Sequence, residues 1–394
     1  MISMKSNASS VLAFGALLLF AGVAAGEESN TVSQGVQATV DGLLDPFWRS
    51  ETMRAEGLFF GMHTNDVEPI AMLAFPPKSI LAVKSASGQT NYMEGRDYTI
   101  DRTTGVMHVP AGSHIPVKTA AEMYPPAQSN LPRIGTKRGD PGTYLIWSEG
   151  HYFHDMQVEV TYTHAAGLWK GPVPVFAGKA LARTIQKLRH HEPIKLCLVG
   201  DSISQGYNAS GYIKVAPFMP PYGQLVALGL ERAYGSKVDF KNFGVAGWGV
   251  GNGLADTNRP IAEQPDLVIV AFGMNDSGKI PTQFAAEIGQ LVAKIQAGSP
   301  RTEFVLVASM MPNAEWAAVH PENIPRFRDE LAKLCGPGVA LADVTGVWIE
   351  LLKRKRWHDL TGNGVNHPND FGHRLYAQMI LGLLVDPGLK LKAP

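Results

Sequence analysis

The sequence predicts two folding units, a β-sandwich followed by a three-layer α/β/α domain. Three observations lead to this prediction. The chain has 394 residues, which is long for a single hydrophobic core. Up to about residue 175, short alternating strand patterns are separated by turns rich in Pro and Gly. From residue 194 onward, apolar strand-like runs alternate with helical patterns, which is typical of a parallel sheet covered by helices on both faces.

Residues 1–26 have the features of a secretory signal peptide. Lys5 provides a positive charge, residues 11–23 form a short apolar run, and the small residues 23–26 precede Glu27. A membrane anchor is the alternative, but the apolar run is short for a bilayer. We therefore expect an exported protein, secreted or periplasmic, that keeps no stable membrane span once this segment has been cleaved.

Residues 29–175 are expected to form a β-sandwich-like accessory domain. Residues 97–101 and 106–109 are predicted to pair as a hairpin, and residues 157–163 alternate between apolar and polar side chains as a half-buried strand does. Residues 123–142 have no periodicity and are expected to form a loop. Residues 176–193 contain a short helical pattern and are interpreted as a solvated linker.

Residues 194–394 are expected to form the α/β/α domain. Further strands are predicted at residues 237–243, 266–272, 303–308 and 339–343, and helices at residues 222–234, 283–296, 324–334 and 370–384. Each connection between successive strands is long enough for the crossover that parallel strands need. The predicted architecture is therefore flavodoxin-like.

The first strand of this domain, which starts near Lys195, ends abruptly at Gly200, so that Ser202 lies at its carboxyl end. In open α/β sheets ligands bind at this edge, which makes Ser202 a candidate nucleophile. Taken alone, the tripeptide at residues 200–202 is also compatible with an ordinary polar turn.

Four short blocks carry a resemblance to a known family. They lie at residues 200–202, 242–247, 273–276 and 367–369, in the order in which the SGNH hydrolases, the GDSL-type esterase superfamily, carry theirs. The chain resembles this superfamily from residue 195 to about 384, and its arrangement is similar to that of two-domain carbohydrate esterases. The resemblance implies that Ser202 is the nucleophile, that Gly247 and Asn275 are oxyanion-hole donors, and that His367 is the general base.

The sequence departs from the family at the residue that orients this histidine. The family usually has an Asp three residues before the His, and here that position is Gly364. A Ser–His pair oriented by a backbone carbonyl or by Asp359 is the preferred interpretation, and Asp370 is a further candidate. His373 is expected to lie behind the catalytic pair rather than to act as the base.

Composition argues against several other functions. The 35 basic and 35 acidic residues cancel and no basic stripe is present, so nucleic acid is not an expected partner. The glycine-dense residues 247–253 lack the pattern of a nucleotide-binding loop. His151, His154 and His164 have no cysteine or carboxylate cluster beside them, so no metal or cofactor is predicted. The two cysteines do not form the dense framework of a disulfide-rich domain.

The expected function is that of an exported serine esterase that removes short acyl groups, acetyl above all, from a polysaccharide or oligosaccharide. Tyr207, Trp248 and Trp316 lie near predicted loops of the active edge, and aromatic faces stack on sugar rings. Such faces also bind alkyl and aryl groups, so a lipid or aryl ester hydrolase is an alternative. A second alternative is a glycan-binding protein whose esterase site has decayed. Gly364 in place of the usual Asp favours this alternative, and the presence of Ser202, Gly247, Asn275 and His367 together argues against it.

Overall fold

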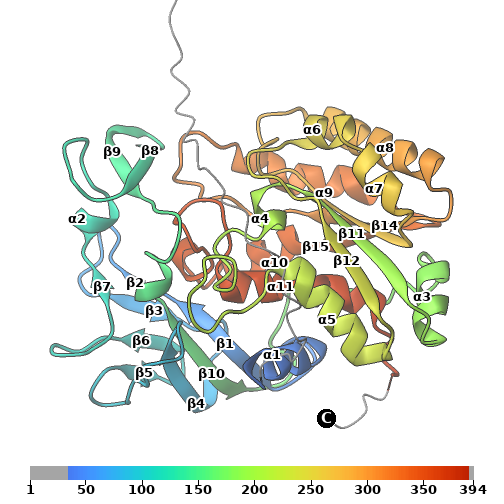
Figure 1. Ribbon diagram of the computed structural model, residues 1–394. Coiled ribbons are helices and arrows are strands. Elements are labelled where there is room, and N and C mark those ends of the chain that lie inside the picture. The colour runs from blue at the N-terminus through green and yellow to red at the C-terminus, as the bar shows by residue number, and fades with distance from the viewer. Residues whose placement is uncertain (1–33, 390–394) are drawn as a thin grey trace, which may run out of the picture. The chain divides into compact units, whose positions relative to one another are not determined.

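A five-stranded parallel sheet forms the centre of the C-terminal part of the chain in the computed structural model, which describes residues 34–389 (Figure 1). The strand order is β12-β11-β13-β14-β15, and all four pairings are parallel. The strands are β11 (Ile194–Gly200), β12 (Val238–Asn242), β13 (Leu267–Ala271), β14 (Glu303–Ala308) and β15 (Val339–Asp343). This sheet confirms the predicted α/β fold class.

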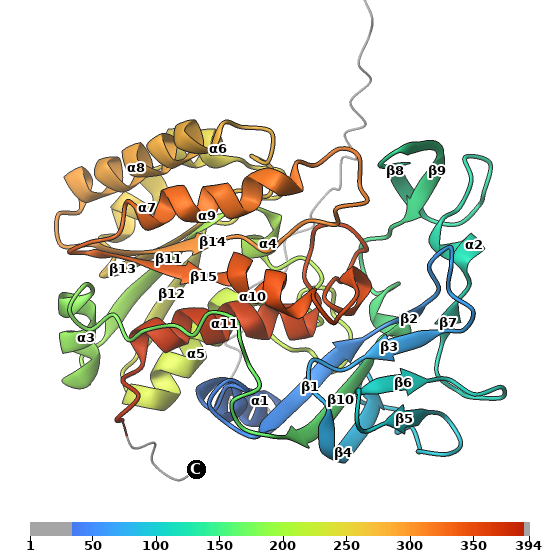
Figure 2. The same ribbon diagram turned by 180° about the vertical axis from the view of Figure 1, so that it is seen from behind.

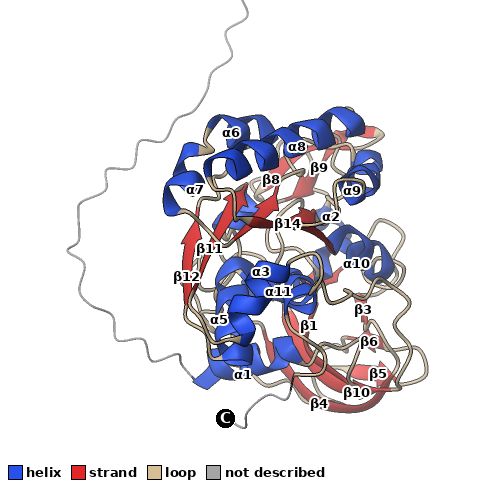
Figure 3. Cartoon of the chain, turned by 90° about the vertical axis from the view of Figure 1, so that its right-hand side faces the viewer, coloured by secondary structure: helices blue, strands red, loops and turns tan. Residues whose placement is uncertain are grey.

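Helices cover both faces of this sheet (Figures 2 and 3). One face carries α6 (Val250–Ala255), α7 (Asn258–Glu263), α8 (Pro281–Gly298) and α9 (Ile324–Ala332). The other carries α3 (Ala182–Arg189), α5 (Tyr222–Tyr234), α10 (Val344–Leu351) and α11 (Asp370–Leu384). Helices were predicted within or close to the bounds of α5, α8, α9 and α11, whereas α6, α7 and α10 were not expected.

The two faces of the sheet build two separate cores because successive side chains of a strand point in opposite directions. In β11, Leu196 and Leu198 pack with α5 and α11, whereas Cys197 and Val199 pack with α8 and α9. All four side chains are buried. A run that is apolar at every position is what a strand covered on both sides requires.

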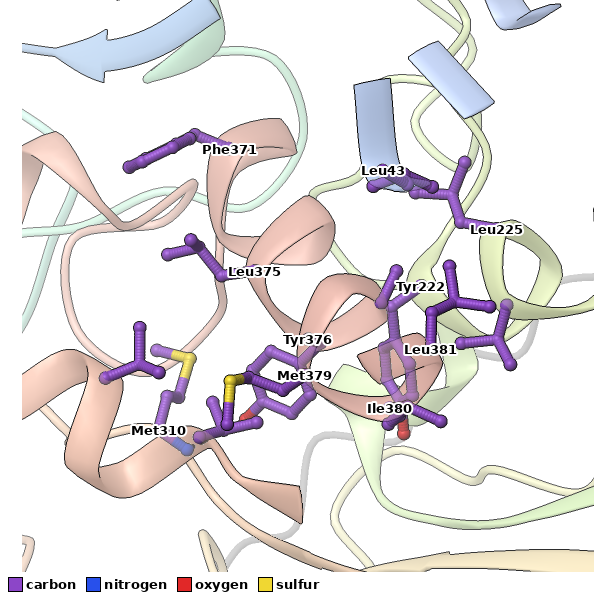
Figure 4. Close-up of a cluster of buried hydrophobic side chains, with 14 of the residues drawn as sticks. Leu43, Tyr222, Leu225, Met310, Phe371, Leu375, Tyr376, Met379, Ile380 and Leu381 are labelled. Carbon is purple, nitrogen blue, oxygen red and sulfur yellow. Dashed lines mark hydrogen bonds between the residues drawn. The ribbon is translucent and has the colours of Figure 1, made fainter. Parts of the chain in front are cut away.

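Helix α11 lies at the centre of the larger core (Figure 4). Its side chains meet residues of α1 (Gln34–Leu44), α5 and the loop after β14, among them Leu43, Tyr222, Leu225 and Met310. Asn369 caps the start of the helix, its side-chain oxygen accepting the Gly372 N–H at 3.0 Å. The same helix therefore fixes the position of the loop that precedes it, which carries His367.

The N-terminal part is rich in short strands, as predicted, and these form four small sheets. The largest has the order β1-β10-β4, made of β1 (Thr52–Leu58), β10 (Val158–His164) and β4 (Pro77–Ser85). A second three-stranded sheet has the order β3-β6-β5, made of β3 (Ile70–Met72), β6 (Val106–His108) and β5 (Thr99–Asp101). The two remaining sheets are pairs, β2 (Phe60–Gly61) with β7 (Val117–Lys118) and β8 (Arg133–Lys137) with β9 (Asp140–Ile146). The predicted hairpin is present as β5 and β6, and the predicted strand at 157–163 is present as β10.

Residues 123–142 differ from the prediction of an irregular loop. They include the end of α2 (Ala120–Met123), all of β8 and the first residues of β9. The hairpin is fixed on the loop after β14, where the Arg138 N–H donates to the Glu315 carbonyl at 2.6 Å and the Ala317 N–H to the Thr136 carbonyl at 3.1 Å. The hairpin of β8 and β9 was not predicted because its sequence lacks the alternation of apolar and polar residues that a strand packed on a core shows. It is instead bonded to a loop that is distant in the sequence.

A buried ionic network joins the β-rich and α/β parts. The Lys355 ammonium lies 2.5 Å from Glu56, and both side chains are fully buried. The Tyr162 hydroxyl donates to the other Glu56 oxygen at 2.6 Å. The chain from Gln34 onward clusters as one compact unit, and the predicted boundaries at 175 and 193 remain a prediction.

Three further predictions concern the membrane, the leader and the cysteines. The proposed signal peptide at residues 1–26 lies outside the described residues. Within residues 34–389, no helix has both the length and the apolar character that crossing a bilayer requires. Cys197 is buried and Cys335 is exposed, and neither forms a disulfide.

Candidate active site

Ser202 lies where strand β11 ends at the active edge of the sheet. Gly200 lets the chain turn closely there, because a Cβ on it would lie 2.5 Å from the Ala271 carbonyl oxygen of the neighbouring strand. Asp201 then caps α4 (Ser202–Gln205), its carboxylate accepting the Ile203 N–H at 3.0 Å. Ser202 is thus the first residue of a short helix, and only 4% of its surface is exposed.

His367 belongs to a loop that is held from inside by one asparagine. The Asn363 side-chain oxygen accepts the backbone N–H groups of Val365, Asn366 and His367 at 3.0 to 3.1 Å. In this loop the His367 Nε2 lies 2.8 Å from the Ser202 Oγ. The structure therefore brings the predicted nucleophile and base into hydrogen-bonding distance, although 165 positions separate them in the sequence.

Gly247 and Asn275 lie on the two neighbouring loops of the same edge. They follow β12 and β13, the strands on either side of β11. The Asn275 amide donates to the Trp248 carbonyl at 3.0 Å, and the Asp276 carboxylate accepts the Val250 N–H at 3.1 Å. These bonds tie the two loops together, and both Gly247 and Asn275 are exposed to an incoming ligand.

Asp359 does not orient His367, which corrects the sequence-based preference. Its carboxylate oxygens accept the backbone N–H of Phe59 at 2.8 Å and of Arg356 at 2.9 Å. Asp370, the other candidate, accepts the Ser210 N–H at 2.7 Å. Both carboxylates are buried and hold backbone segments, and neither is among the groups that contact the His367 Nδ1.

The His373 ring contacts backbone groups through both of its nitrogens. Its Nε2 lies 3.0 Å from the Tyr207 carbonyl and its Nδ1 lies 3.4 Å from the Tyr222 backbone nitrogen. Complete burial, with a smaller contribution from the nearby His367, lowers the pKa of His373 to about 4, although the bond to the Tyr207 carbonyl acts in the opposite direction. A neutral ring with both nitrogens occupied agrees with the expectation that His373 lies behind the catalytic pair.

Three polar side chains surround the second nitrogen of His367, and sequence reasoning missed them all. The Nδ1 lies 3.0 Å from a Glu149 carboxylate oxygen, 3.1 Å from the Asn208 side-chain oxygen and 3.0 Å from the Asn363 Nδ2. Glu149 follows β9 in the β-rich part, outside every block that resembles the family. No local signal marks it, because its position depends on how the two parts of the chain pack.

Of the three aromatic residues expected near the active edge, Tyr207 and Trp248 lie there and Trp316 does not. The Tyr207 ring centroid lies 5.0 Å from that of His367 and 5.1 Å from that of Tyr212. Trp248 lies next to the exposed Gly247, with the Arg259 guanidinium 5.6 Å from its ring centroid. Trp316 instead packs on β8, where a Cβ on Gly135 would lie 2.6 Å from its indole nitrogen.

Burial strongly shifts the pKa of one residue beside the nucleophile. Loss of solvent, together with the nearby Asp276, raises the pKa of Asp201 to about 7, while bonds from backbone N–H groups act in the opposite direction. The Asp201 side chain accepts the Ile203 N–H and stabilises the turn between β11 and α4.

The histidines considered as metal ligands are engaged separately. His151 pairs with Asp155 at 2.5 Å, His154 Nε2 lies 2.8 Å from the Ala216 carbonyl, and His164 Nδ1 lies 2.9 Å from the Ala165 carbonyl. Between residues 34 and 389, no three His, Cys, Asp or Glu side chains come together as a group that could hold a metal ion.

Comparison with known families agrees with this geometry. Residues 198–375, somewhat less than half of the chain, match the GDSL-like lipase/acylhydrolase family. This part of the chain is a GDSL-like hydrolase domain. The matched range includes Ser202, Gly247, Asn275 and His367, and the domain is a carboxylic-ester hydrolase. No curated protein matches the sequence.

Several solved structures resemble the GDSL-like domain at low identity. An α/β hydrolase from the metagenome of Lake Arreo, Spain, is 22% identical, with a TM-score of 0.40, over 48% of this chain and 96% of that one. A two-domain esterase active on acetylated mannans is 19% identical, with a TM-score of 0.44, over 57% of this chain and 58% of that one. An acetylxylan esterase from Geobacillus stearothermophilus is 20% identical, with a TM-score of 0.39, over 48% of this chain and 92% of that one.

Proposed function

We propose that the protein is an exported serine esterase that removes acetyl groups from a polysaccharide or oligosaccharide. The observation that carries the ester hydrolysis is the 2.8 Å distance between the Ser202 Oγ and the His367 Nε2 at the active edge of the sheet. A serine hydroxyl becomes nucleophilic when a positioned base takes its proton, and histidine has the basicity for this task.

The mechanism uses the side chains of this edge in two half-reactions. Ser202 Oγ attacks the ester carbonyl carbon while its proton passes to His367 Nε2, and the Asn275 amide and the Gly247 N–H stabilise the oxyanion. His367 then returns the proton to the leaving alcohol as the C–O bond breaks, which leaves an acyl-serine. Water attacks this acyl group with His367 again as the base, which releases the acid and restores Ser202.

The exposure of the site supports a small acyl group on a polar alcohol. Ser202 and His367 are only 4% and 5% exposed, so the reacting acyl group must enter a narrow space. Asn275 and Gly247 on the rim are exposed, and Tyr212 is 37% exposed. A sugar ring can lie on such a polar and aromatic rim while only its acetyl group reaches the serine.

Turnover of p-nitrophenyl acetate tests the esterase proposal. The chain starting at Glu27 is expected to hydrolyse it, and Ser202→Ala is expected to lose the activity. Ser204→Ala is the matched control, since Ser204 lies on the same short helix with its Oγ on the Tyr222 hydroxyl at 2.8 Å. Equal rates for the wild type and Ser202→Ala would remove the esterase proposal and favour a glycan-binding protein.

Two further measurements test the substrate and the export. Acetate release from acetylated xylan is expected to exceed cleavage of octanoyl esters, and a strong preference for the long chain would favour a lipid esterase instead. N-terminal sequencing of protein recovered outside the cytoplasm of an expressing bacterium is expected to start near Glu27. An intact N-terminus on protein retained in the cytoplasm would contradict export.

A further inference from the structure

A segment of the β-rich part crosses the loop that carries His367. It follows β9 and runs from Trp147 to Gly150. The Ser148 N–H donates to the Asn363 carbonyl at 3.3 Å, and the Asn208 amide donates to the Gly150 carbonyl at 3.1 Å. The segment is thus bonded both to the His367 loop and to the loop after Ser202, and it places Glu149 between them.

The protonation of His367 decides what its Nδ1 needs. The Nε2 must be unprotonated to accept the Ser202 proton, so in the resting enzyme the hydrogen is on Nδ1 and requires an acceptor. The two Glu149 oxygens lie 3.0 and 3.2 Å from Nδ1. The Asn363 Nδ2 is a donor, and its hydrogens go to Glu149 at 2.9 Å and to Asn366 at 2.9 Å, so it is not the acceptor.

Asn208 is the competing acceptor, with its Oδ1 3.1 Å from Nδ1. Its amide nitrogen donates to the Gly150 and Gly362 carbonyls at 3.1 and 3.0 Å, which turns the oxygen toward the imidazole. An amide oxygen is neutral, however, whereas a carboxylate also stabilises the imidazolium that forms when Ser202 is deprotonated. Charge therefore favours Glu149 for the step that matters in catalysis.

The space beside Gly364, where the family usually has an Asp, is filled by residues on either side of Glu149. A Cβ at this position would lie 2.5 Å from the Ile146 carbonyl oxygen and 2.8 Å from a Phe153 ring carbon, and its backbone φ is +94°. No side chain fits there while residues 146–153 keep their course. The segment that excludes an aspartate from position 364 is the same segment that presents Glu149 to His367.

We propose that Glu149 is the acidic positioning residue of this active site, so that the β-rich part completes a Ser202–His367–Glu149 triad. Glu149 accepts a hydrogen bond from the Nδ1–H of neutral His367, fixes the ring toward Ser202 and stabilises the imidazolium when the ring is protonated. The proposal rests on the esterase function proposed above.

The test compares Glu149→Gln with the wild type on p-nitrophenyl acetate. By analogy with other triads that lose the acid, kcat is expected to fall by about 10²- to 10⁴-fold, with KM changed far less. Asp155→Asn is the control, because this exposed carboxylate lies six positions along the chain from Glu149 and, within residues 34–389, its side chain pairs with His151 and not with His367. Glu149 is one-third exposed, so the variant is expected to fold, and its thermal unfolding checks this.

A pH profile separates positioning of the base from mere support of the fold. Because removing the carboxylate takes a negative charge away from the imidazole, the acid limb of the kcat/KM profile is expected to move to lower pH. In Glu149→Ala, added formate is expected to restore part of the rate, whereas Asp155→Asn should show neither effect.

Several results would overturn the proposal. Glu149→Gln within about threefold of the wild type would do so, as would a slow variant whose acid limb stays in place. A loss confined to Asn208→Ala would assign the acceptor role to the amide. If the wild type and Ser202→Ala were equally inactive, the esterase function itself would fail, which is a different outcome from an active enzyme that tolerates Glu149→Gln.

Discussion

Replacing Gly364 by Ala should destabilise the protein by more than the backbone conformation alone explains. A non-glycine residue at positive φ costs about 1–2 kcal/mol. The added methyl group would also lie 2.5 Å from the Ile146 carbonyl and 2.8 Å from Phe153, in a place where overpacking costs about 1–3 kcal/mol more. The backbone cannot rotate away easily, because the Gly364 carbonyl accepts bonds from Asn313 at 3.0 Å and Trp357 at 3.1 Å. The sum is a loss of about 2–5 kcal/mol.

Gly112→Ala provides the control for this prediction, since Gly112 has a φ of +83° and nothing within 4 Å of its missing Cβ. Urea unfolding of both variants, with the m-value unchanged, should show a clearly larger loss for Gly364→Ala. Folded Gly364→Ala should also hydrolyse p-nitrophenyl acetate more slowly, because relief of the clash displaces the segment that carries Glu149. Equal stability losses in the two variants would refute the steric argument, and full activity would refute the link to Glu149.

Two further predictions concern buried charges. Glu56→Ala should lower the free energy of unfolding by about 3–5 kcal/mol, since it removes the carboxylate 2.5 Å from the buried Lys355 ammonium and leaves it with the more distant Asp359 carboxylate at 3.7 Å. Urea unfolding should show most of this loss recovered when Lys355 is also replaced by Met. Burial raises the pKa of Asp201 to about 7, against about 4 in the unfolded chain, so its stabilising effect is complete below pH 4 and is lost as the pH rises through 7. Relative to Asp201→Asn, the wild type should therefore lose about 3–5 kcal/mol of unfolding free energy between pH 4 and 7, and parallel pH curves for the two proteins would contradict this.

The α/β part of the chain could be predicted from the sequence because its signals are local. A strand covered on both faces is apolar at each position, as β11 is from residue 196 to 199, and such a run ends visibly at Gly200. The strand order then follows from the rules of parallel sheets, and it places Ser202 beside the loops of Gly247 and Asn275. Short helices such as α6 were missed, since six residues are too few to show a helical period.

The acceptor for His367 could not be predicted because it depends on packing between distant segments. Sequence proximity favoured Asp359, eight positions before the histidine, but its carboxylate faces Phe59 of the β-rich part. Glu149 lies more than 200 positions away and reaches Nδ1 only because β9 ends against the His367 loop. Gly364 showed in the sequence only that the usual Asp is missing, and the structure adds that Ile146 and Phe153 occupy the space of its side chain.

The β-rich part holds the stretch that leads into the His367 loop through several hydrogen bonds, and we expect these bonds to support catalysis whether or not this part binds glycan. The Gln157 amide donates to the carbonyls of His358 and Thr361 at 3.1 and 2.7 Å, and the Phe59 N–H donates to Asp359 at 2.8 Å. A base must stay within a few tenths of an ångström of its nucleophile to act on it. Because these bonds fix the stretch from residue 358 to 361 that leads into the loop, and Glu149 faces the imidazole from the same part of the chain, a GDSL-like domain without the β-rich part would keep its nucleophile and lose the groups that position its base.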